Sequence, residues 1–320
     1  MQSNSEIIGC GTSSPQISVV MSVYNGEETL SGTIESILDQ RGVDFEFIIV
    51  NDGSTDGAGE ILNRYAALDR RVRLLSQVNK GLTEALVNGC AKARGRYIAR
   101  QDVGDLSLPA RLDKQLESLE EDSNVVATSC INRFVGPRGE FLYEGGLLED
   151  PTLELMSTDV HTIRAPIGAS AMFRKDDYQI VGGYRRHFRV AQDLDLWLRL
   201  VERGKCTIVP QVLYQCLVFP SSISGTLRDE QVRAARIAIE CRSLRAAGKC
   251  ETEALRRLEQ LRDKPSFLRF KCANGSYYIG RCLQNSDPAR ANTYYRQALM
   301  YWPIYPKAWW HLFRNAVTRS

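Results

Sequence analysis

The sequence has no long apolar segment and no closely paired cysteines. No stretch approaches the roughly 20 apolar residues that cross a bilayer, and the N-terminus lacks a basic patch followed by an apolar signal core. The nine cysteines are odd in number, and none of them forms the C-x-x-C pair that clips zinc. We therefore expect free thiols in a reducing compartment. The expected location is cytoplasmic, with peripheral contact at the inner face of the membrane.

Acidic residues are scarce in the last part of the chain. Residues 228–320 carry 18 Lys and Arg against 8 Asp and Glu, a net charge of +10, whereas residues 1–227 carry 23 against 30, a net charge of −7. A basic segment of this kind can attract anionic lipid or nucleic acid, but arginines on solvated helices are commoner. Charge alone leaves these interpretations open.

Strands and helices alternate through the first hundred residues. The runs ISVVMSVYN from Ile17 and FEFIIV from Phe45 are apolar and β-branched, which predicts strands buried on both faces. Residues 29–40 between them have helical spacing. Further helices are expected at residues 57–67 and 82–93, and further strands at 72–76 and 97–102. This alternation predicts a doubly wound, mostly parallel, Rossmann-like α/β sheet.

The pattern changes after the PSSISG loop at Pro220, beyond which the whole chain is predicted to be helical. We expect a flexible segment at residues 1–14, an α/β domain at 15–225 and an all-helical extension at 226–320. Two amphipathic segments around Asp287-Pro288 are similar to a tetratricopeptide-type hairpin, although one such unit cannot build a solenoid.

Polar residues follow the first two strands, at the point where each one ends. Because the carboxyl ends of parallel strands meet at one crevice, Tyr24, Asn25, Asp52, Ser54 and Asp56 are expected to share a site. A carboxylate such as Asp52 can accept the imide proton of a pyrimidine base or the hydroxyls of a ribose. Alternatively, Asp52 and Ser54 only cap the next helix.

Two further acidic motifs suggest chemistry at the same crevice. In RQDVGD, Asp102 and Asp105 can share a hard divalent ion, which would relieve their mutual repulsion, or they are ordinary loop residues. In AQDLDLW, Asp193 is predicted at a helix N-terminus, where the dipole favours an ionised carboxylate that can serve as a general base. Alternatively, Asp193 is the N-cap, and Asp195 complements the dipole.

The order and spacing of these motifs resemble the family 2 glycosyltransferases with the GT-A fold. The similar segments are ISVVMSVYNGEETL, DFEFIIVNDGSTD, NKGLTEALVNGCAKARGRYIARQDVGD, SLPARL, VGGY and QDLDLWLRL, within residues 15–215. The resemblance implies an inverting enzyme that moves a sugar from a nucleotide-diphosphate sugar, usually a UDP sugar, with the aid of Mn²⁺ or Mg²⁺. It also implies a hydroxyl-bearing glycan or lipid-linked acceptor.

The resemblance also implies roles for individual residues. Those implied for the nucleotide sugar are Ser22, Tyr24, Asn25, Asp52, Ser54, Asn79, Lys80, Gly81, Arg100 and Asp102. Asp102 and Asp105 correspond to the metal-binding motif, but Gly104 stands where many members have its middle aspartate. Asp193 corresponds to the catalytic base. Gly168, Ala169, Ser170 and Gln192 are expected on the acceptor side, where small residues leave room, although tight packing would also explain the first three.

Two other functions compete with this one. Gly104 and Gln192 depart from the family pattern, which is compatible with a catalytically reduced binding or scaffold protein that acts through its helical tail. A nucleotidyltransferase would need a glycine-rich loop with a basic residue after the first strand, where the chain has SVYNGEET. Processive synthases of the family carry transmembrane helices and Q-x-x-R-W, and this chain has neither, which favours transfer of single sugars.

The basic helices are expected to bring such an enzyme to a lipid-linked acceptor, and no nucleic acid partner is expected. The arginines behind this hypothesis are Arg228, Arg233, Arg236, Arg242 and Arg245.

Overall fold

The structure is a computed structural model of the chain, and it describes residues 14–222, 227–259 and 268–317. The flexible segment expected at residues 1–14 lies, apart from its last residue, outside the described residues. The same holds for the predicted domain boundary at residue 225. The eight cysteines in the described ranges are all unpaired thiols.

The first half of the chain forms a parallel sheet with helical crossovers. Its elements are β1 (Ile17–Val23), α1 (Glu27–Leu38), β2 (Phe45–Asn51), α2 (Ala58–Leu68), β3 (Val72–Ser76), α3 (Leu82–Cys90) and β4 (Tyr97–Asp102). The strands lie in the order β3-β2-β1-β4, and all three ladders are parallel. The carboxyl ends of β1, β2 and β4 therefore meet at one edge, as the sequence predicts.

The second half extends this sheet beyond β4. Its elements are β5 (Leu106–Ser107), α4 (Arg111–Glu121), β6 (Val125–Val135), β7 (Phe141–Gly145), α5 (Pro151–Leu155), a 3-10 turn (Gly168–Ser170), β8 (Met172–Arg174), α6 (Lys175–Ile180), α7 (Gln192–Leu200) and β9 (Lys205–Leu217). Short β8 joins β4 to β6 through antiparallel pairs, and β9 runs parallel to β6. The predicted doubly wound, mostly parallel α/β fold is confirmed.

Helices cover both faces of the sheet because side chains alternate along each strand. On one face, Val19 and Met21 of β1 pack with helices α1, α2 and α4. On the other face, Val20 packs with α3 and α7. These side chains are fully buried, and burial of each aliphatic side chain stabilises the fold by about 1.5–3 kcal/mol.

The predicted helical extension is also confirmed. Its helices are α9 (Arg228–Ala246), α10 (Thr252–Glu259), α11 (Leu268–Leu283), α12 (Pro288–Tyr301) and α13 (Pro306–Val317). Asp287 caps α12 by accepting from the Arg290 N–H, and Pro288 occupies the first turn, where its missing N–H costs nothing.

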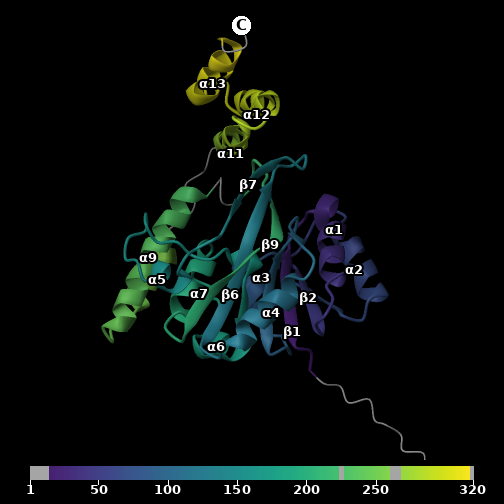
Figure 1. Cartoon of the computed structure of the whole chain (residues 1–320), viewed down its shortest axis with the longest axis vertical. Coiled ribbons are helices and arrows are strands. Elements are labelled where there is room, and N and C mark those ends of the chain that lie inside the picture. Colours follow the sequence, from purple (N-terminus) through teal and green to yellow (C-terminus); the bar gives the residue numbers. More distant parts are fainter. Residues whose placement is uncertain (1–13, 223–226, 260–267, 318–320) are drawn as a thin grey trace, which may run out of the picture.

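The C-terminal helices that the structure describes pack in two different places. Helices α9 and α10 bury Ile237, Cys241 and Leu258 in the core that also contains α7. Helices α11 to α13 instead form their own apolar cluster, which Leu142 of β7 joins. Figure 1 shows α9 alongside the α/β part and α11, α12 and α13 beyond the end of β7. Within the described ranges, no helix is both long and apolar enough to span a bilayer.

Candidate active site

The loops that follow β1 and β2 are joined by hydrogen bonds. Asn25, which has a left-handed backbone (φ 62°), donates its N–H to Ser54 Oγ at 2.9 Å, and its Oδ1 accepts from the Thr55 N–H at 2.8 Å. Asp56 accepts from the Gly26 and Glu27 amides at 2.8 and 3.0 Å. The structure thus brings together the residues that the sequence predicts at these two strand ends.

Two more predicted nucleotide residues lie at the end of β1. Tyr24 is 52% exposed next to the joined loops. Ser22 is buried and pairs in register with Asp102 of β4, so the ends of these two strands are adjacent.

Asp52 fixes the loop that contains Asn79, Lys80 and Gly81. Its Oδ1 accepts from Gln77 Nε2 at 2.7 Å and from the Lys80 N–H at 2.9 Å, and its Oδ2 accepts from the Gly81 N–H at 2.8 Å. Asp52 does not cap α2, whose N-cap residue is Gly57. The carboxylate is buried, while the three loop residues are exposed. The predicted donor loop is therefore anchored at the end of β2.

Gly53 permits this anchoring. Its φ of 75° is in the left-handed region, and a Cβ added there would lie 2.7 Å from the Asn79 nitrogen. Any side chain at this position would push the loop away from the strand.

Arg100 links the acidic turn to a buried tyrosine. Its guanidinium is 2% exposed, forms an ion pair with Asp102, and donates from Nη1 to the Tyr184 hydroxyl at 3.3 Å. Burial alone would lower the pKa of Arg100, but Asp102 and Tyr184 outweigh it and raise that pKa above its usual value. Arg100 Nε is buried without a hydrogen-bond partner. The arginine is therefore a fixed positive charge at the end of β4.

The side chain of Gln101 stabilises the turn from Asp102 to Asp105. Its Nε2 donates to the main-chain oxygens of Asp102 and Asp105 at 3.2 and 3.0 Å. Gly104 has φ 92° and donates its N–H to Thr33 Oγ1 at 3.0 Å. This backbone conformation favours glycine over the aspartate that many family members have at the corresponding position.

Asp105 is buried beside β9. It is 8% exposed, and its Oδ1 accepts from the Leu217 N–H of β9 at 2.8 Å. Burial, together with the charge of Asp102, raises the pKa of Asp105 to about 8. A positive charge placed between these two carboxyls would lower that pKa.

The acidic turn fits a divalent cation that arrives with a phosphate ligand. In the described part of the chain, no three His, Cys, Asp or Glu side chains are grouped closely enough to bind a metal ion. However, Mg²⁺ is usually bound by one or two carboxylates together with substrate phosphates, and carboxylate oxygens also suit Mn²⁺. Asp102 and Asp105 supply these two carboxylates.

Asp193 lies in the first turn of α7. Its Oδ1 accepts from the Leu194 N–H at 2.9 Å. Burial raises the pKa of Asp193; Arg100 acts against this, and Asp102 adds to it. The predicted effect of the helix terminus is therefore smaller than the effect of burial. Because the charges of Arg100 and Asp102 both act on the pKa of Asp193, the three side chains lie in one region of the protein.

The predicted acceptor-side residues differ in their relation to Asp193. A Cβ added to Gly168 would lie 2.7 Å from Asp193 Oδ2, so the glycine backbone lies directly against the carboxylate. Ala169 is partly buried, and Gln192 is buried at the start of α7. Ser170 faces the interior, where its Oγ donates to Asn132 Oδ1 at 2.9 Å. Ser170 therefore stabilises the Gly168–Ser170 segment from the protein interior.

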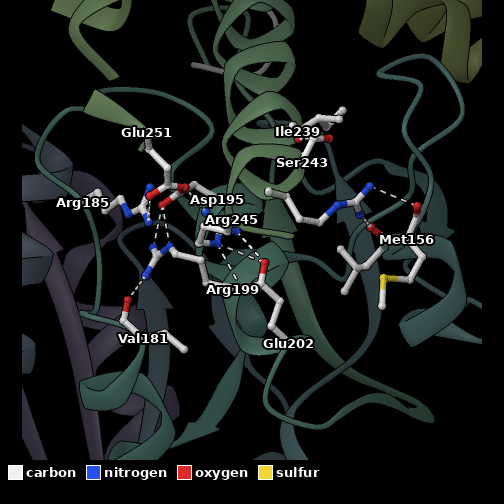
Figure 2. A network of polar contacts seen from close by, with 12 residues as sticks. Met156, Val181, Arg185, Asp195, Arg199, Glu202, Ile239, Ser243, Arg245 and Glu251 are labelled. Atoms are coloured by element: carbon white, nitrogen blue, oxygen red, sulfur yellow. Dashed lines mark hydrogen bonds and ion pairs between the residues drawn. The ribbon is translucent and has the colours of Figure 1, made fainter. Parts of the chain in front are cut away.

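Ion pairs anchor α7 to the C-terminal helices. Asp195, only 1% exposed, accepts from Arg199 Nη2 at 2.5 Å and lies 3.6 Å from Arg185 Nη1. Arg185 also binds Glu251 at 2.8 Å, and Glu251 in turn pairs with Arg245 of α9. Figure 2 shows these charged groups converging between α7 and α9. Asp195 is thus an anchor of the helix that carries Asp193.

Two arginines that the sequence assigns to a membrane surface are engaged inside the protein. Arg245 also binds Glu202 at 2.7 Å. Arg242 is 8% exposed and donates to main-chain oxygens, those of Met156 and Ser157 at 3.0 and 2.9 Å. Arg228, Arg233 and Arg236 remain exposed.

Sequence reasoning overlooked several residues that shape the site. Arg111 is fully buried and donates to the Arg100 main-chain oxygen at 2.5 Å. Tyr214 of β9 accepts from the Asp102 N–H at 3.1 Å, and the Arg111 guanidinium lies 4.8 Å from the centroid of its ring. Arg111 and Tyr184 lie in the SLPARL and VGGY segments, whose resemblance to the family could have indicated that they belong to the site. Nothing marked Tyr214, because β9 was not predicted.

The chain is similar in sequence to known proteins. The model of the family described as "Glycosyl transferase family 2" matches residues 18–181, which is half of the chain. The chain belongs to this family. The putative glycosyltransferase EpsE of Bacillus subtilis (strain 168) is 39% identical to this family 2 chain over 200 residues, which are 60% of this chain and 69% of EpsE. The O-antigen biosynthesis glycosyltransferase WbnJ of Escherichia coli is 34% identical over 187 residues, 58% of this chain and 71% of WbnJ.

Solved structures show the same fold as this family 2 chain. TarS 1-349 of S. aureus matches with a TM-score of 0.56 and 14% identity, over 94% of this chain and 88% of TarS 1-349. Mannosyltransferase PcManGT of Pyrobaculum calidifontis, solved with GDP-Man and Mn²⁺, matches with a TM-score of 0.55 and 17% identity, over 96% and 87%. The predicted GT-A fold is confirmed, whereas the roles of the individual site residues stay predictions.

Proposed function

We propose that this chain is an inverting, non-processive glycosyltransferase. It moves a single sugar, a hexose in the simplest case, from a nucleotide-diphosphate sugar to a hydroxyl group, in the assembly of a cell-surface polysaccharide or glycoconjugate. Family membership supports transfer of a sugar, and the role in assembly is supported by WbnJ, which is named for O-antigen biosynthesis. The observation that carries the proposal is the arrangement of three charged groups. Arg100 is ion-paired with Asp102, and its main-chain N–H donates at 2.8 Å to the oxygen of Ala171. Ala171 follows the Gly168–Ser170 turn, against which Asp193 packs.

The donor is proposed to bind over the ends of β1, β2 and β4. Tyr24, Asn25 and the loop held by Asp52 would contact the nucleoside, and Arg100 would face the diphosphate as a buried positive charge. We propose a UDP sugar. A structure of TarS with UDP and that of PcManGT with GDP-Man support a nucleotide donor.

A divalent cation, Mn²⁺ or Mg²⁺, belongs to the proposal. Asp102 and Asp105 would hold it together with donor oxygens, and the Mn²⁺ in PcManGT supports this choice. When bound, the ion would compensate the charge that develops on the leaving diphosphate.

Asp193 is proposed to act as the general base. Its carboxylate would take the proton of the acceptor hydroxyl while the hydroxyl oxygen bonds to the anomeric carbon from the side opposite the diphosphate. The bond from the anomeric carbon to the diphosphate oxygen breaks, and the nucleoside diphosphate leaves with that electron pair. One displacement inverts the configuration. Gly168 and the buried start of α7 fix the Asp193 carboxylate beside the acceptor space.

The acceptor is proposed to be a glycan or a lipid-linked hydroxyl compound. A lipid-linked acceptor would draw the enzyme to the inner face of the membrane, which its basic C-terminal helices would contact. No role for nucleic acid is proposed.

The replacement Asp193→Asn tests the mechanism. Asparagine keeps the shape and the acceptor for the Leu194 N–H but cannot take a proton, so turnover should fall about 10²–10⁴-fold. A thermal shift with UDP sugars and Mn²⁺ should still report donor binding. Asp44→Asn, at the exposed amino end of β2, is the control.

Two outcomes would contradict this account. Unchanged turnover in Asp193→Asn would remove Asp193 as the base. If the wild type released no nucleoside diphosphate with any UDP sugar, metal or acceptor, the alternative of a catalytically reduced scaffold protein would be favoured. The anomeric configuration of the product, measured by NMR, decides whether the reaction inverts.

A further inference from the structure

Helix α13 carries large apolar side chains that the fold leaves uncovered. Trp309, Trp310 and Phe313 are 57%, 56% and 71% exposed, and Ile304, in the loop before the helix, is 76% exposed. Together with Pro306, the three aromatic residues follow the i, i+3, i+4, i+7 spacing that places side chains on one side of a helix. The exposed side of α13 is therefore almost wholly apolar.

The opposite side of α13 accounts for its packing. Ala308, His311 and Asn315 are buried there, and the helix packs against α12. The indole N–H of Trp309 is satisfied by the Pro303 oxygen at 2.8 Å, so the exposed ring needs no polar partner. Figure 1 shows α13 at the end of the molecule farthest from the sheet. Apolar patches of this kind mark interaction surfaces.

The surroundings of this apolar side are strongly basic. Residues 268–317 contain seven Lys and Arg and a single acidic residue, Asp287. Lys307 and Arg314, seven residues apart, lie along one edge of the exposed side, and the Arg314 guanidinium is 4.9 Å from the centroid of the Trp310 ring.

We propose that this surface, the α13 face, docks on an anionic lipid bilayer. It consists of Ile304, Trp309, Trp310 and Phe313 with Lys307 and Arg314 at its edge. Tryptophan and phenylalanine insert at the boundary between headgroups and acyl chains, while Lys and Arg bind anionic headgroups. The net charge of the three helices complements such a membrane.

Charge also argues against a second copy of the chain as the occupant. In a symmetric contact the same patch lies on both partners, so Lys307 and Arg314 of both copies would be brought together. The surface also differs from the one expected from the sequence, because Arg242 and Arg245 of α9 are engaged inside the protein. The inference deepens the proposed membrane contact and rests on the proposed function.

Flotation of the full chain with vesicles tests the α13 face. Vesicles of phosphatidylcholine and phosphatidylglycerol should bind the wild type at low salt, and pure phosphatidylcholine should bind it weakly. Trp310→Gln with Phe313→Gln should weaken binding at least about tenfold, because the inserting rings are lost. Lys307→Gln with Arg314→Gln should weaken binding to anionic vesicles about thirtyfold. Leu68→Gln, at an exposed site on α2, is the matched control.

The outcomes separate the inference from the proposed function. The replaced side chains are exposed, apart from Arg314, which is partly buried against Trp310. Unchanged thermal unfolding would show that the variants fold. Absence of vesicle binding by the wild type, or equal binding by all variants, would overturn the inference. A concentration-dependent dimer abolished by Phe313→Gln would also overturn it in favour of self-association. These variants should transfer sugar to a soluble acceptor as well as the wild type does. If the wild type itself showed no sugar transfer, that result would count against the proposed function alone.

Discussion

At the scale of single residues, the lack of a side chain at Gly168 allows the Asp193 carboxylate to pack against the main chain. The backbone of Gly168 is so close that an added Cβ would be 2.6 Å from Asp193 Cβ, well inside van der Waals contact. Burial of Asp193 at this contact also raises its pKa. An ionised carboxylate with a raised pKa accepts a proton more readily. The close packing that positions Asp193 therefore also increases its strength as a base.

Asp105 provides a test at the same scale, because burial and the neighbouring Asp102 raise its pKa to about 8 from an ordinary value of 3.8. The folded state therefore binds the Asp105 proton more tightly than the unfolded state does. This contribution to stability is present below pH ~4 and is lost as the pH rises towards ~8, with a slope of at most about 1.4 kcal/mol per pH unit.

Asp105→Asn should remove this pH dependence while keeping an oxygen for the Leu217 N–H. In EDTA, urea unfolding should show the variant gaining stability relative to the wild type between about pH 5 and pH 8. Added Mn²⁺ with UDP should stabilise the wild type more than the variant. A difference between the two proteins that does not change with pH would contradict the raised pKa of Asp105.

At the scale of secondary-structure elements, α7 is fixed by charges that come from distant parts of the chain. Asp195 and Arg199 belong to α7 itself, and Arg185 connects them to Glu251 at the start of α10. Glu251 has two arginine partners, Arg185 and Arg245, and all three side chains are less than a quarter exposed. Its carboxylate therefore couples the helix of Asp193 to the helical extension.

Glu251→Gln should destabilise the protein by about 1–3 kcal/mol, because it leaves two largely buried guanidinium groups short of an acceptor. Thermal unfolding measures this loss, and turnover at a permissive temperature should fall as α7 becomes less well positioned. Glu253→Gln, two residues further on, breaks the exposed pair with Arg256 and should have no measurable effect on stability. Equal unfolding temperatures for the two variants would show that the buried ion pairs do not anchor α7.

Regular elements with a clear period were predictable, and irregular ones were not. Strands β3 and β4 have the bounds expected from the sequence, residues 72–76 and 97–102. The strand pattern also predicted that Asp52 and Asp102 lie at one edge of the sheet. Strand β9 escaped prediction because Pro210 interrupts its apolar run and because it pairs with β6 through several register shifts. The side chain of Tyr214 could not be placed without that strand.

Individual contacts at the site were less predictable than its location. Nothing in the sequence indicated that Asp52 would be hydrogen-bonded to the amides of the Lys80 and Gly81 loop, because such a contact depends on loop geometry. Likewise, the ion pairs of Asp195 with Arg199 and Arg185 depend on tertiary packing, whereas its place in the first turn of α7 suggested only a dipole effect.

At the scale of the whole molecule, the chain has apolar cores that do not coincide with a simple division at residue 225. Ile237 and Cys241 of α9 and Leu258 of α10 share a core with the sheet and α7. Helices α11 to α13 form a separate core, which Leu142 of β7 and Val218 after β9 join. The predicted α/β and helical domains therefore need an experimental test of where folding units end.

Two truncated chains test the division. A chain of residues 1–267 keeps α9, α10 and the ion pairs of Glu251, so it should unfold cooperatively at a temperature only moderately below that of the full chain. A chain of residues 1–227 loses these groups and exposes the apolar surface of α7, so it should lack a cooperative transition in calorimetry and should bind a hydrophobic dye. Cooperative unfolding of the 1–227 chain would instead support a folding unit that ends near residue 225. Failure of the 1–267 chain to fold would show that α11 to α13 are needed by the α/β part.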